Sequence, residues 1–325
     1  MTAKSLAVVL GATRGQGASV INALLKTGQY TIRGLTIDAS LPAAEDLRKR
    51  GVEVIEVDLD NPEAVKSAFT SALVIFAVTT MYAGDVEREV QQGINIANAA
   101  ASTDTLAHYI WSTLPSASTV SEGKISVPHM DGKARVDEYI LSQLPHLASR
   151  TTFYWGGFYA ENVTYPNNLP TRLETAGQSH VWVQAVTAGT EIPLVGDHTV
   201  NTGLFVRQIL AKADLCLPGK YVLGVVDWID NGELLKLWLP YLEKHGKGLD
   251  PIYVRTDLEA VARLWPGTGK ELGGMLKLSE ELGRKAWSKK DVIPLTFRDL
   301  GLSVGGGDDE LVGTERAIKK LGSRV

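Results

Sequence analysis

The stretch Val8–Leu25, VVLGATRGQGASVINALL, places Gly11, Gly15 and Gly17 between an apolar run and a helical pattern. Glycines at the turn from a strand into a helix let the backbone bend tightly and approach a diphosphate, whose charge the helix N-terminus stabilises. The stretch therefore predicts a dinucleotide-binding loop. The residues expected to contact the cofactor are Gly11, Ala12, Thr13, Arg14, Gly15, Gln16 and Gly17.

Two residues give opposing indications about which dinucleotide binds. The spacing G-x-x-x-G-x-G is typical of Tyr-dependent short-chain dehydrogenases, and Arg14 precedes its second glycine, where a guanidinium can bind an adenosine 2′-phosphate. Asp38 lies just past the second strand, at the distance expected of a ribose-binding acid, which favours NAD(H). We give more weight to Arg14, because Asp38 is equally suited to cap a helix beginning near Pro42. NADP(H) is the preferred cofactor, with NAD(H) as the alternative.

Short β-branched runs alternate with helical patterns through residue 156, which predicts a doubly wound parallel sheet, the Rossmann-like α/β class. Expected strands are Leu6–Leu10, Tyr30–Thr36, Val52–Val57, Leu73–Val78, His108–Ser112 and Thr151–Tyr154. Expected helices are Gln16–Thr27, Pro42–Arg50, Pro62–Ser71 (capped by Asn61), Val86–Ala101, Asp131–Leu144 and Glu310–Leu321. We expect an NAD(P)-binding domain at 1–156 and a smaller substrate-binding lobe at 157–325, part of which returns to the main sheet.

Bulk composition excludes several classes of protein. The formal net charge of −4 is not that of a nucleic-acid binder, and no apolar run is long enough to cross a membrane. The single cysteine, Cys216, rules out a disulfide framework, so we expect a cytoplasmic protein that acts on a small molecule. The six histidines lack the paired spacing of a metallohydrolase, and we expect no metal site. A homo-oligomer is compatible with the sequence.

Several motifs, in order over residues 6–165, resemble the NmrA-like family, a branch of the atypical short-chain dehydrogenases. They are the Val8–Leu25 stretch, Asp58-Leu59-Asp60, Ser112-Thr113-Leu114-Pro115, His129-Met130-Asp131-Gly132-Lys133 and Gly157-Phe158-Tyr159-Ala160-Glu161-Asn162. The later Asn201-Thr202-Gly203 is a fainter match.

The resemblance implies further cofactor contacts. Asp58 and Leu59 would flank the adenine, Lys133 would hold the nicotinamide ribose, and Ser112 would lie nearby. The segments Ala77, Val78, Thr79 and Trp155, Gly156, Gly157, Phe158 would line the nicotinamide side. Two positions depart from the family: its usual glycine at position 14 is arginine, and its usual basic residue after the second strand is Ile37. The 2′-phosphate contact would then have moved to Arg14.

The expected proton donor for carbonyl reduction is missing. Tyr-dependent relatives use Tyr-x-x-x-Lys, but here the tyrosine position is His129, four residues before Lys133. His129 could act as the acid beside Lys133; equally, it could be a capping or core histidine, with Lys133 only a cofactor ligand. Tyr82 and Tyr159 are further candidate donors, or aromatic walls of the site.

A missing donor suits the reduction of an iminium, which accepts hydride without needing a proton. Aromatic faces would suit such a cation, although the same residues also suit core packing. Candidates are Tyr154, Trp155, Phe158, Tyr159, Tyr165 and Trp182, and we expect Tyr82, Phe158, Tyr159, Asn162 and Trp182 at the substrate. The resemblance includes fungal alkaloid-pathway reductases of cyclic imines, such as those of the swainsonine type, and NADP-binding regulators without turnover. A secondary-metabolism imine or carbonyl reductase is the first hypothesis; a redox sensor that docks a protein partner is the second.

Overall fold

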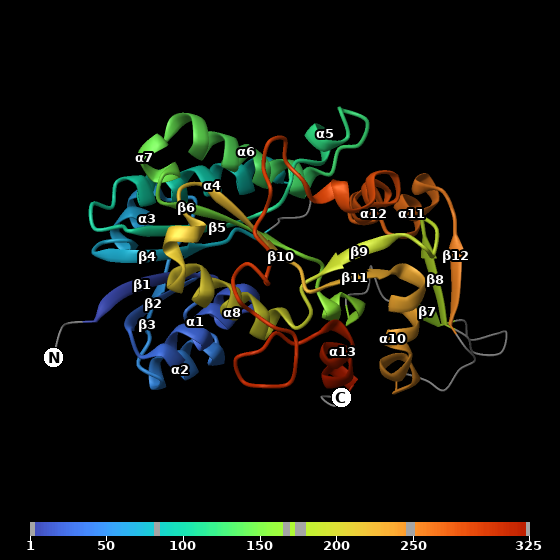
Figure 1. Cartoon of the computed structure of the whole chain (residues 1–325), viewed down its shortest axis with the longest axis horizontal. Helices are drawn as coiled ribbons and strands as arrows, with labels where there is room; N and C mark the ends of the chain where they lie inside the picture. Colours follow the sequence, from blue (N-terminus) through green and yellow to red (C-terminus); the bar gives the residue numbers. More distant parts are fainter. Residues whose placement is uncertain (1–3, 81–84, 165–169, 173–179, 245–250, 323–325) are drawn as a thin grey trace.

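A seven-stranded parallel sheet forms the centre of the molecule (Figure 1). The computed structural model describes residues 4–80, 85–164, 170–172, 180–244 and 251–322. The strand order is β10-β6-β5-β4-β1-β2-β3, so the order reverses between β1 and β4. The strands are β1 (Ser5–Leu10), β2 (Tyr30–Thr36), β3 (Glu53–Glu56), β4 (Ala72–Ala77), β5 (His108–Thr113), β6 (Thr151–Gly156) and β10 (Lys220–Gly224). The Rossmann-like α/β class predicted from sequence is confirmed.

Helices cover both faces of the sheet, as alternating side chains on β1 require. Ala7 and Val9 enter one core together with α1 (Gly15–Thr27), α2 (Pro42–Lys49) and α8 (His198–Ala211). Val8 and Leu10 enter the other core, formed with α3 (Pro62–Ala68), α4 (Val86–Ala101) and α6 (Pro128–Gln143). Among the described residues, no helix combines the length and apolar character needed to cross a bilayer.

Most predicted bounds fall within two residues of those observed. The ranges of β2 and α4 match, and Asn61 caps α3 as predicted, its side chain accepting a hydrogen bond from the Ala64 amide. Helix α3 ends at Ala68, earlier than predicted. Helix α6 begins at Pro128 instead of residue 131, because proline is tolerated in a first helical turn. The last helix, α13 (Thr314–Gly322), begins four residues later than predicted.

The chain after residue 157 completes the Rossmann layers with α8 and β10. Strand β10 pairs with β6 in parallel, and Tyr221 stacks on Phe153 with ring centroids 4.6 Å apart. Helix α8 packs along α1, where the Gly203 amide donates to the Ser19 hydroxyl. The buried Asn201 side chain bonds the main chain of both Val195 and Val312. These contacts fasten the second half of the chain onto the first.

The remaining elements form a smaller lobe beside the sheet (Figure 1). It contains a three-stranded sheet, β12-β8-β7, a two-stranded sheet, β11-β9, and a separate apolar core around Trp182 and Trp238. Its strands are β7 (Thr171–Arg172), β8 (His180–Gln184), β9 (Glu191–Leu194), β11 (Asp227–Asp230) and β12 (Ile252–Arg255). Its helices are η1 (Ala160–Thr164), α10 (Asn231–Lys244), α11 (Leu258–Leu264), α12 (Gly269–Leu282), η2 (Gly283–Trp287) and α13.

The close approach of α8 to α1 gives a first prediction. A Cβ added at Gly203 would clash with the backbone carbonyl of Ser19, which cannot move without shifting α1. We expect Gly203→Ala to lower the free energy of unfolding by about 2 kcal/mol, measured by urea denaturation. Gly189→Ala is the matched control, because a Cβ there meets no atom within 4 Å. Equal stability of the two variants would contradict the packing argument.

Candidate functional site

The glycine loop has the backbone geometry that its sequence predicts. Gly11 and Gly15 adopt left-handed conformations, with φ of 66° and 50°. A Cβ at Gly17 would clash with the carbonyls of Leu10 and Gly11, so glycine lets α1 start directly against the end of β1. Arg14 at the N-cap makes no side-chain cap hydrogen bond. The first-turn amides of α1 thus lie at the carboxyl edge of the sheet where the strand order reverses, without a side-chain cap and suited to an anion. Doubly wound sheets bind ligands at this edge, which we call the crevice.

Arg14 and Asp38 lie close enough to interact. Two hydrogen bonds from Ser40 hold the pKa of Asp38 below its usual value, and the positive charge of Arg14 lowers that pKa further. The alternative that Asp38 caps α2 is wrong, because the N-cap of α2 is Leu41, without a side-chain cap bond. Ile37, where the family usually has a basic residue, is 70% exposed. Arg14, the residue predicted to bind the 2′-phosphate, therefore supplies the positive charge that Ile37 cannot.

The segment after β3 lies at the same carboxyl edge of the sheet, next to the end of β2. Asp58 is exposed, and its carboxylate accepts a hydrogen bond from the Asp60 amide. Leu59 is half-buried, and Asn95 donates to its carbonyl. An exposed carboxylate and a half-buried apolar side chain thus follow β3, and their contact with an adenine stays a prediction.

Lys133 reaches from α6 to the carboxyl end of β4. Its ammonium lies 2.8 Å from both Glu89 Oε1 and Thr79 Oγ1, and 3.2 Å from the Thr79 carbonyl. The Thr79 hydroxyl donates to the same Glu89 oxygen, at 2.8 Å. Glu89 is almost fully buried on α4, so it holds Lys133 in one position through a desolvated ion pair. Ala77 is the last residue of β4, and Val78 connects it to Thr79.

His129 does not share the environment of Lys133. Its Nδ1 lies 2.9 Å from Glu271 Oε1, and its backbone amide donates to the same oxygen at 2.8 Å. Burial alone would raise the pKa of Glu271, but the hydrogen bonds and charge of His129 bring it below the usual value. Because Glu271 belongs to α12, this contact ties the Rossmann layers to the second lobe, and it holds the His129 ring on Glu271.

A chain of polar side chains crosses the crevice beside the loop. Ser112 at the end of β5 donates to Gln16 Oε1 at 2.7 Å, and Gln16 Nε2 donates to the Tyr159 hydroxyl at 2.7 Å. The Tyr159 ring stacks on His198, with centroids 4.2 Å apart and planes at 6°. His198 Nδ1 forms an ion pair with Glu161. Three predicted site residues, Gln16, Ser112 and Tyr159, are thus brought together. Two residues that sequence reasoning did not assign, Glu161 and His198, join them.

The predicted aromatic pocket is only partly present. Tyr154, Trp155 and Trp182 are fully buried in three different cores. The expectations that Trp155 lines the nicotinamide side and that Trp182 lies at the substrate are therefore corrected. Trp155 lies within β6, and Trp182 packs edge-on against Trp238. Alternation along a strand sends these rings inward. Tyr82 and Tyr165 lie outside the described residues.

The segment after β6 connects the crevice to the second lobe. Gly156 ends β6, and the Gly157 amide donates to the Gly224 carbonyl of β10. The amide of half-buried Phe158 donates to the Pro193 carbonyl of β9, and its carbonyl accepts from the Val195 amide, just after β9. Asn162 lies in η1, half-buried. Phe158 and Tyr159 therefore remain the accessible aromatic side chains of this segment.

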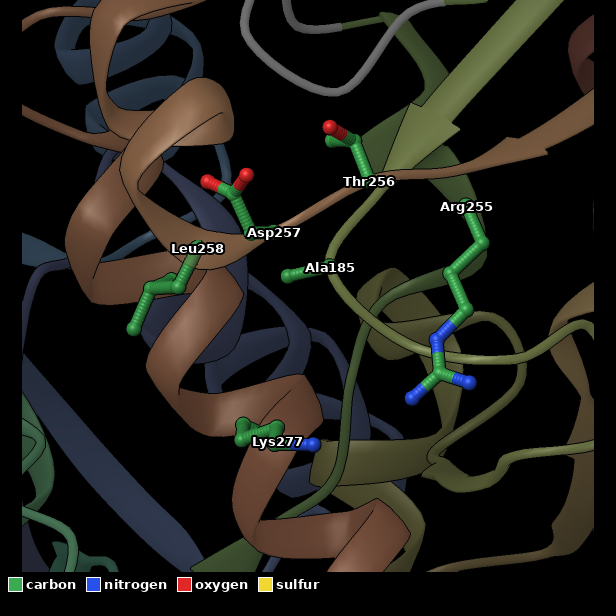
Figure 2. Close-up of a pocket in the computed structure, with 6 residues that line it drawn as sticks. All are labelled: Ala185, Arg255, Thr256, Asp257, Leu258 and Lys277. Atoms are coloured by element: carbon green, nitrogen blue, oxygen red, sulfur yellow. The ribbon is translucent and has the colours of Figure 1, made fainter.

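A surface hollow of about 470 Å³ lies in the second lobe, away from the predicted site residues (Figure 2). Arg255 and Lys277 border it, but both pair with Glu280, which offsets their charge. The lining residues are Ala185, Arg255, Thr256, Asp257, Leu258 and Lys277. None was predicted to bind cofactor or substrate, so we centre the site on the crevice.

Sequence reasoning missed Glu89, Glu161 and His198. A signal existed for Glu89, which is a charged residue among the otherwise uncharged buried residues of α4. For His198, the cap residue Asp197 marks a helix start, as its side chain accepts from the Thr199 amide. Nothing in the sequence indicates that this start lies beside the glycine loop, because the two are more than 180 residues apart.

Comparison with known proteins decides the family. The family model for the NmrA-like family matches residues 3–285. The chain belongs to the NmrA-like family. The resemblance inferred from the motifs is thereby confirmed, and the match extends across both lobes.

The curated NmrA-like relatives match part of the chain. The NmrA-like family domain-containing oxidoreductase cpsB of Aspergillus campestris is 28% identical over 144 residues, 43% of this chain and 42% of that protein. The oxidoreductase notA of an Aspergillus species is 30% identical over 136 residues, 40% of each chain. The matched stretch thus covers less than half the length of each relative.

Solved NmrA-like structures share the fold over almost the whole chain. The crystal structure of NmrA, a negative transcriptional regulator, in complex with NADP superposes with a TM-score of 0.69. The superposition covers 98% of this chain and 91% of that one, at 21% identity. At this identity the likeness shows the fold.

Asp137 is a buried carboxyl on the same helix as Lys133. Trp111 Nε1 and Thr113 Oγ1 donate to its Oδ1 at 2.9 and 2.6 Å. Burial raises its pKa to about 8, although these hydrogen bonds oppose the shift. A raised pKa means that the neutral acid stabilises the fold at low pH, and this stabilisation is lost as the pH rises from about 4 to about 8.

Asp137→Asn should remove this pH dependence, because the amide keeps an acceptor for Trp111 and Thr113 but carries no charge. We expect the stability of the variant relative to wild type to increase by about 1 kcal/mol per pH unit between pH 5 and 8, and to level off above. Urea denaturation at five pH values measures the difference. A difference that stays constant over this range would contradict the buried titration.

Proposed function

We propose that this NmrA-like protein is an NADPH-dependent reductase that transfers hydride to a small cyclic imine or iminium in secondary metabolism, with carbonyl reduction as a variant. One observation carries the proposal. The uncapped N-terminus of α1 and the fixed ammonium of Lys133 lie at the same carboxyl edge of the sheet. Doubly wound sheets bind dinucleotides at this edge.

The residues at the crevice fit a nicotinamide dinucleotide. The amides of the glycine loop would bind the diphosphate, and Arg14 the 2′-phosphate. Asp58 and Leu59 would flank the adenine, and Lys133 would hold the nicotinamide ribose. When bound, the reduced cofactor supplies a hydride to the substrate. The solved NmrA structure with NADP supports the fit through its shared fold.

The absence of a tyrosine at position 129 supports an iminium substrate. Hydride adds to the iminium carbon, the C=N π electrons move to nitrogen, and the product is a neutral amine, so no proton is transferred in that step. His129 is held by Glu271 at the lobe boundary, which leaves it poorly placed as an acid. Tyr159 and Phe158 would present aromatic faces to the cation. The relatives cpsB and notA, both named oxidoreductases, support turnover over a purely regulatory role.

Replacing Lys133 tests the reductase. Lys133→Ala combined with Glu89→Gln avoids leaving an unpaired buried carboxylate. We expect kcat/KM for NADPH oxidation, with a panel of cyclic imines and ketones, to fall by roughly 100-fold through lost positioning. Arg135→Ala is the control on the same helix, because Arg135 pairs with Glu87 at the surface. NADPH binding without turnover on any substrate would instead favour the redox sensor.

Replacing Arg14 tests the cofactor preference. We expect Arg14→Ala to raise the Kd of NADPH by about 10-fold while leaving that of NADH nearly unchanged, since only NADPH carries the 2′-phosphate. Asp38→Asn, which removes a negative charge near Arg14, should lower the Kd of NADPH. Isothermal titration measures both. Equal weakening of the two cofactors by Arg14→Ala would rule out the 2′-phosphate contact.

A further inference from the structure

His198, the first residue of α8, lies directly over the glycine loop. A Cβ built on Gly15 would lie 3.7 Å from His198 Nε2. The residue is 8% exposed, although it begins a helix. The side chain thus reaches the loop from the second half of the chain.

The imidazole is fixed on two sides. Glu161 pairs with Nδ1, and the Tyr159 ring covers one face of the imidazole. Among the described residues, none forms a hydrogen bond with Nε2, the nitrogen that faces Gly15. An imidazole that is held on two sides, with one nitrogen lacking a protein partner and facing the loop, is suited to donate to a ligand bound there.

The position that Nε2 faces is the one a cofactor diphosphate would need. Gly15 begins α1 in the loop expected to contact the diphosphate, whose charge suits the amides of a helix N-terminus. The Cβ that Gly15 lacks would point toward His198. We propose that His198 donates a hydrogen bond from Nε2 to the cofactor diphosphate, opposite the amides of α1. The inference rests on the proposed dinucleotide binding and assigns a ligand that no loop motif contains.

The charges around the ring suit this role. Glu161 lies against Nδ1, so the ring nitrogen left to donate to the diphosphate is Nε2. The other carboxylate at this helix start, Asp197, pairs with Lys320 at 2.7 Å, so its charge is offset. The N-terminus of the 14-residue helix α8 also favours an anion nearby.

The geometry does not suit the alternative of a proton relay from His198 to Tyr159. The two rings are stacked nearly parallel, whereas the ring nitrogens donate in the plane of the imidazole. The Tyr159 hydroxyl instead accepts a hydrogen bond from Gln16. Stacking on Tyr159 therefore orients the imidazole and leaves Nε2 directed at the loop.

The test compares two ligands that differ in the diphosphate. NADPH carries it, whereas 2′-AMP has the adenosine and 2′-phosphate alone. We expect His198→Phe, which keeps a flat ring against Tyr159, to raise the Kd of NADPH by about 10-fold to 100-fold, the effect of one charge-assisted hydrogen bond. The Kd of 2′-AMP should stay within about twofold of wild type. His198→Gln, whose amide can donate near the Nε2 position, should restore part of the NADPH affinity.

His146→Phe is the matched control, because His146 is exposed on α7 (Pro145–Ala148). Thermal unfolding checks that each variant is folded. If His198→Phe does not fold, Glu161→Gln should show a smaller weakening with the same selectivity for NADPH. Equal changes for both ligands, or no change, would overturn the diphosphate contact. If the wild-type protein did not bind NADPH at all, the proposed function would be overturned as well. The measurement on wild type therefore distinguishes a wrong assignment of His198 from a wrong function.

Discussion

The contact of α1 with the end of β1, where Gly17 lies against the carbonyls of Leu10 and Gly11, sets the position of every other part of the site. Any side chain at Gly17 would push the helix away from the strand and turn its amides from the crevice. The same principle recurs at Gly203, which lets α8 approach α1. Two glycines thus bring two helix N-termini, one from each half of the chain, to the same edge of the sheet.

Helix α6 carries a row of ionisable groups that the sheet forces into low dielectric. His129, Lys133 and Asp137 follow one another at four-residue intervals and therefore lie on one face. Each has a different kind of partner: His129 pairs with Glu271, Lys133 pairs with Glu89, and Asp137 accepts hydrogen bonds from uncharged donors. Buried pairs of this kind add little net stability, but an unmatched charge is costly, so they fix where each side chain can lie. For Lys133 this means one defined position facing the crevice.

Features that depend on neighbouring residues could be predicted from the sequence, whereas those that depend on distant contacts could not. The β1–loop–α1 unit and the Asn61 cap are local patterns, and both are observed. Strand β10 was not predicted as such, because a five-residue run gains its structure from pairing with β6. The alternating pattern of β8 indicates that the Trp182 side chain points inward. It does not indicate that Trp182 is buried in the separate core of the second lobe. His198 reaches Gly15 only through tertiary packing.

The return of β10 to the sheet has a consequence for synthesis of the chain. Strand β6 ends at residue 156, but the neighbour that covers its edge begins at residue 220. At translation rates of about 5–20 residues per second, the edge stays unpaired for several seconds while the intervening segment is made. That edge carries Phe153, Tyr154 and Trp155, a combination prone to pair with other chains. The nascent chain therefore passes through a stage at which chaperones would have a specific strand to shield.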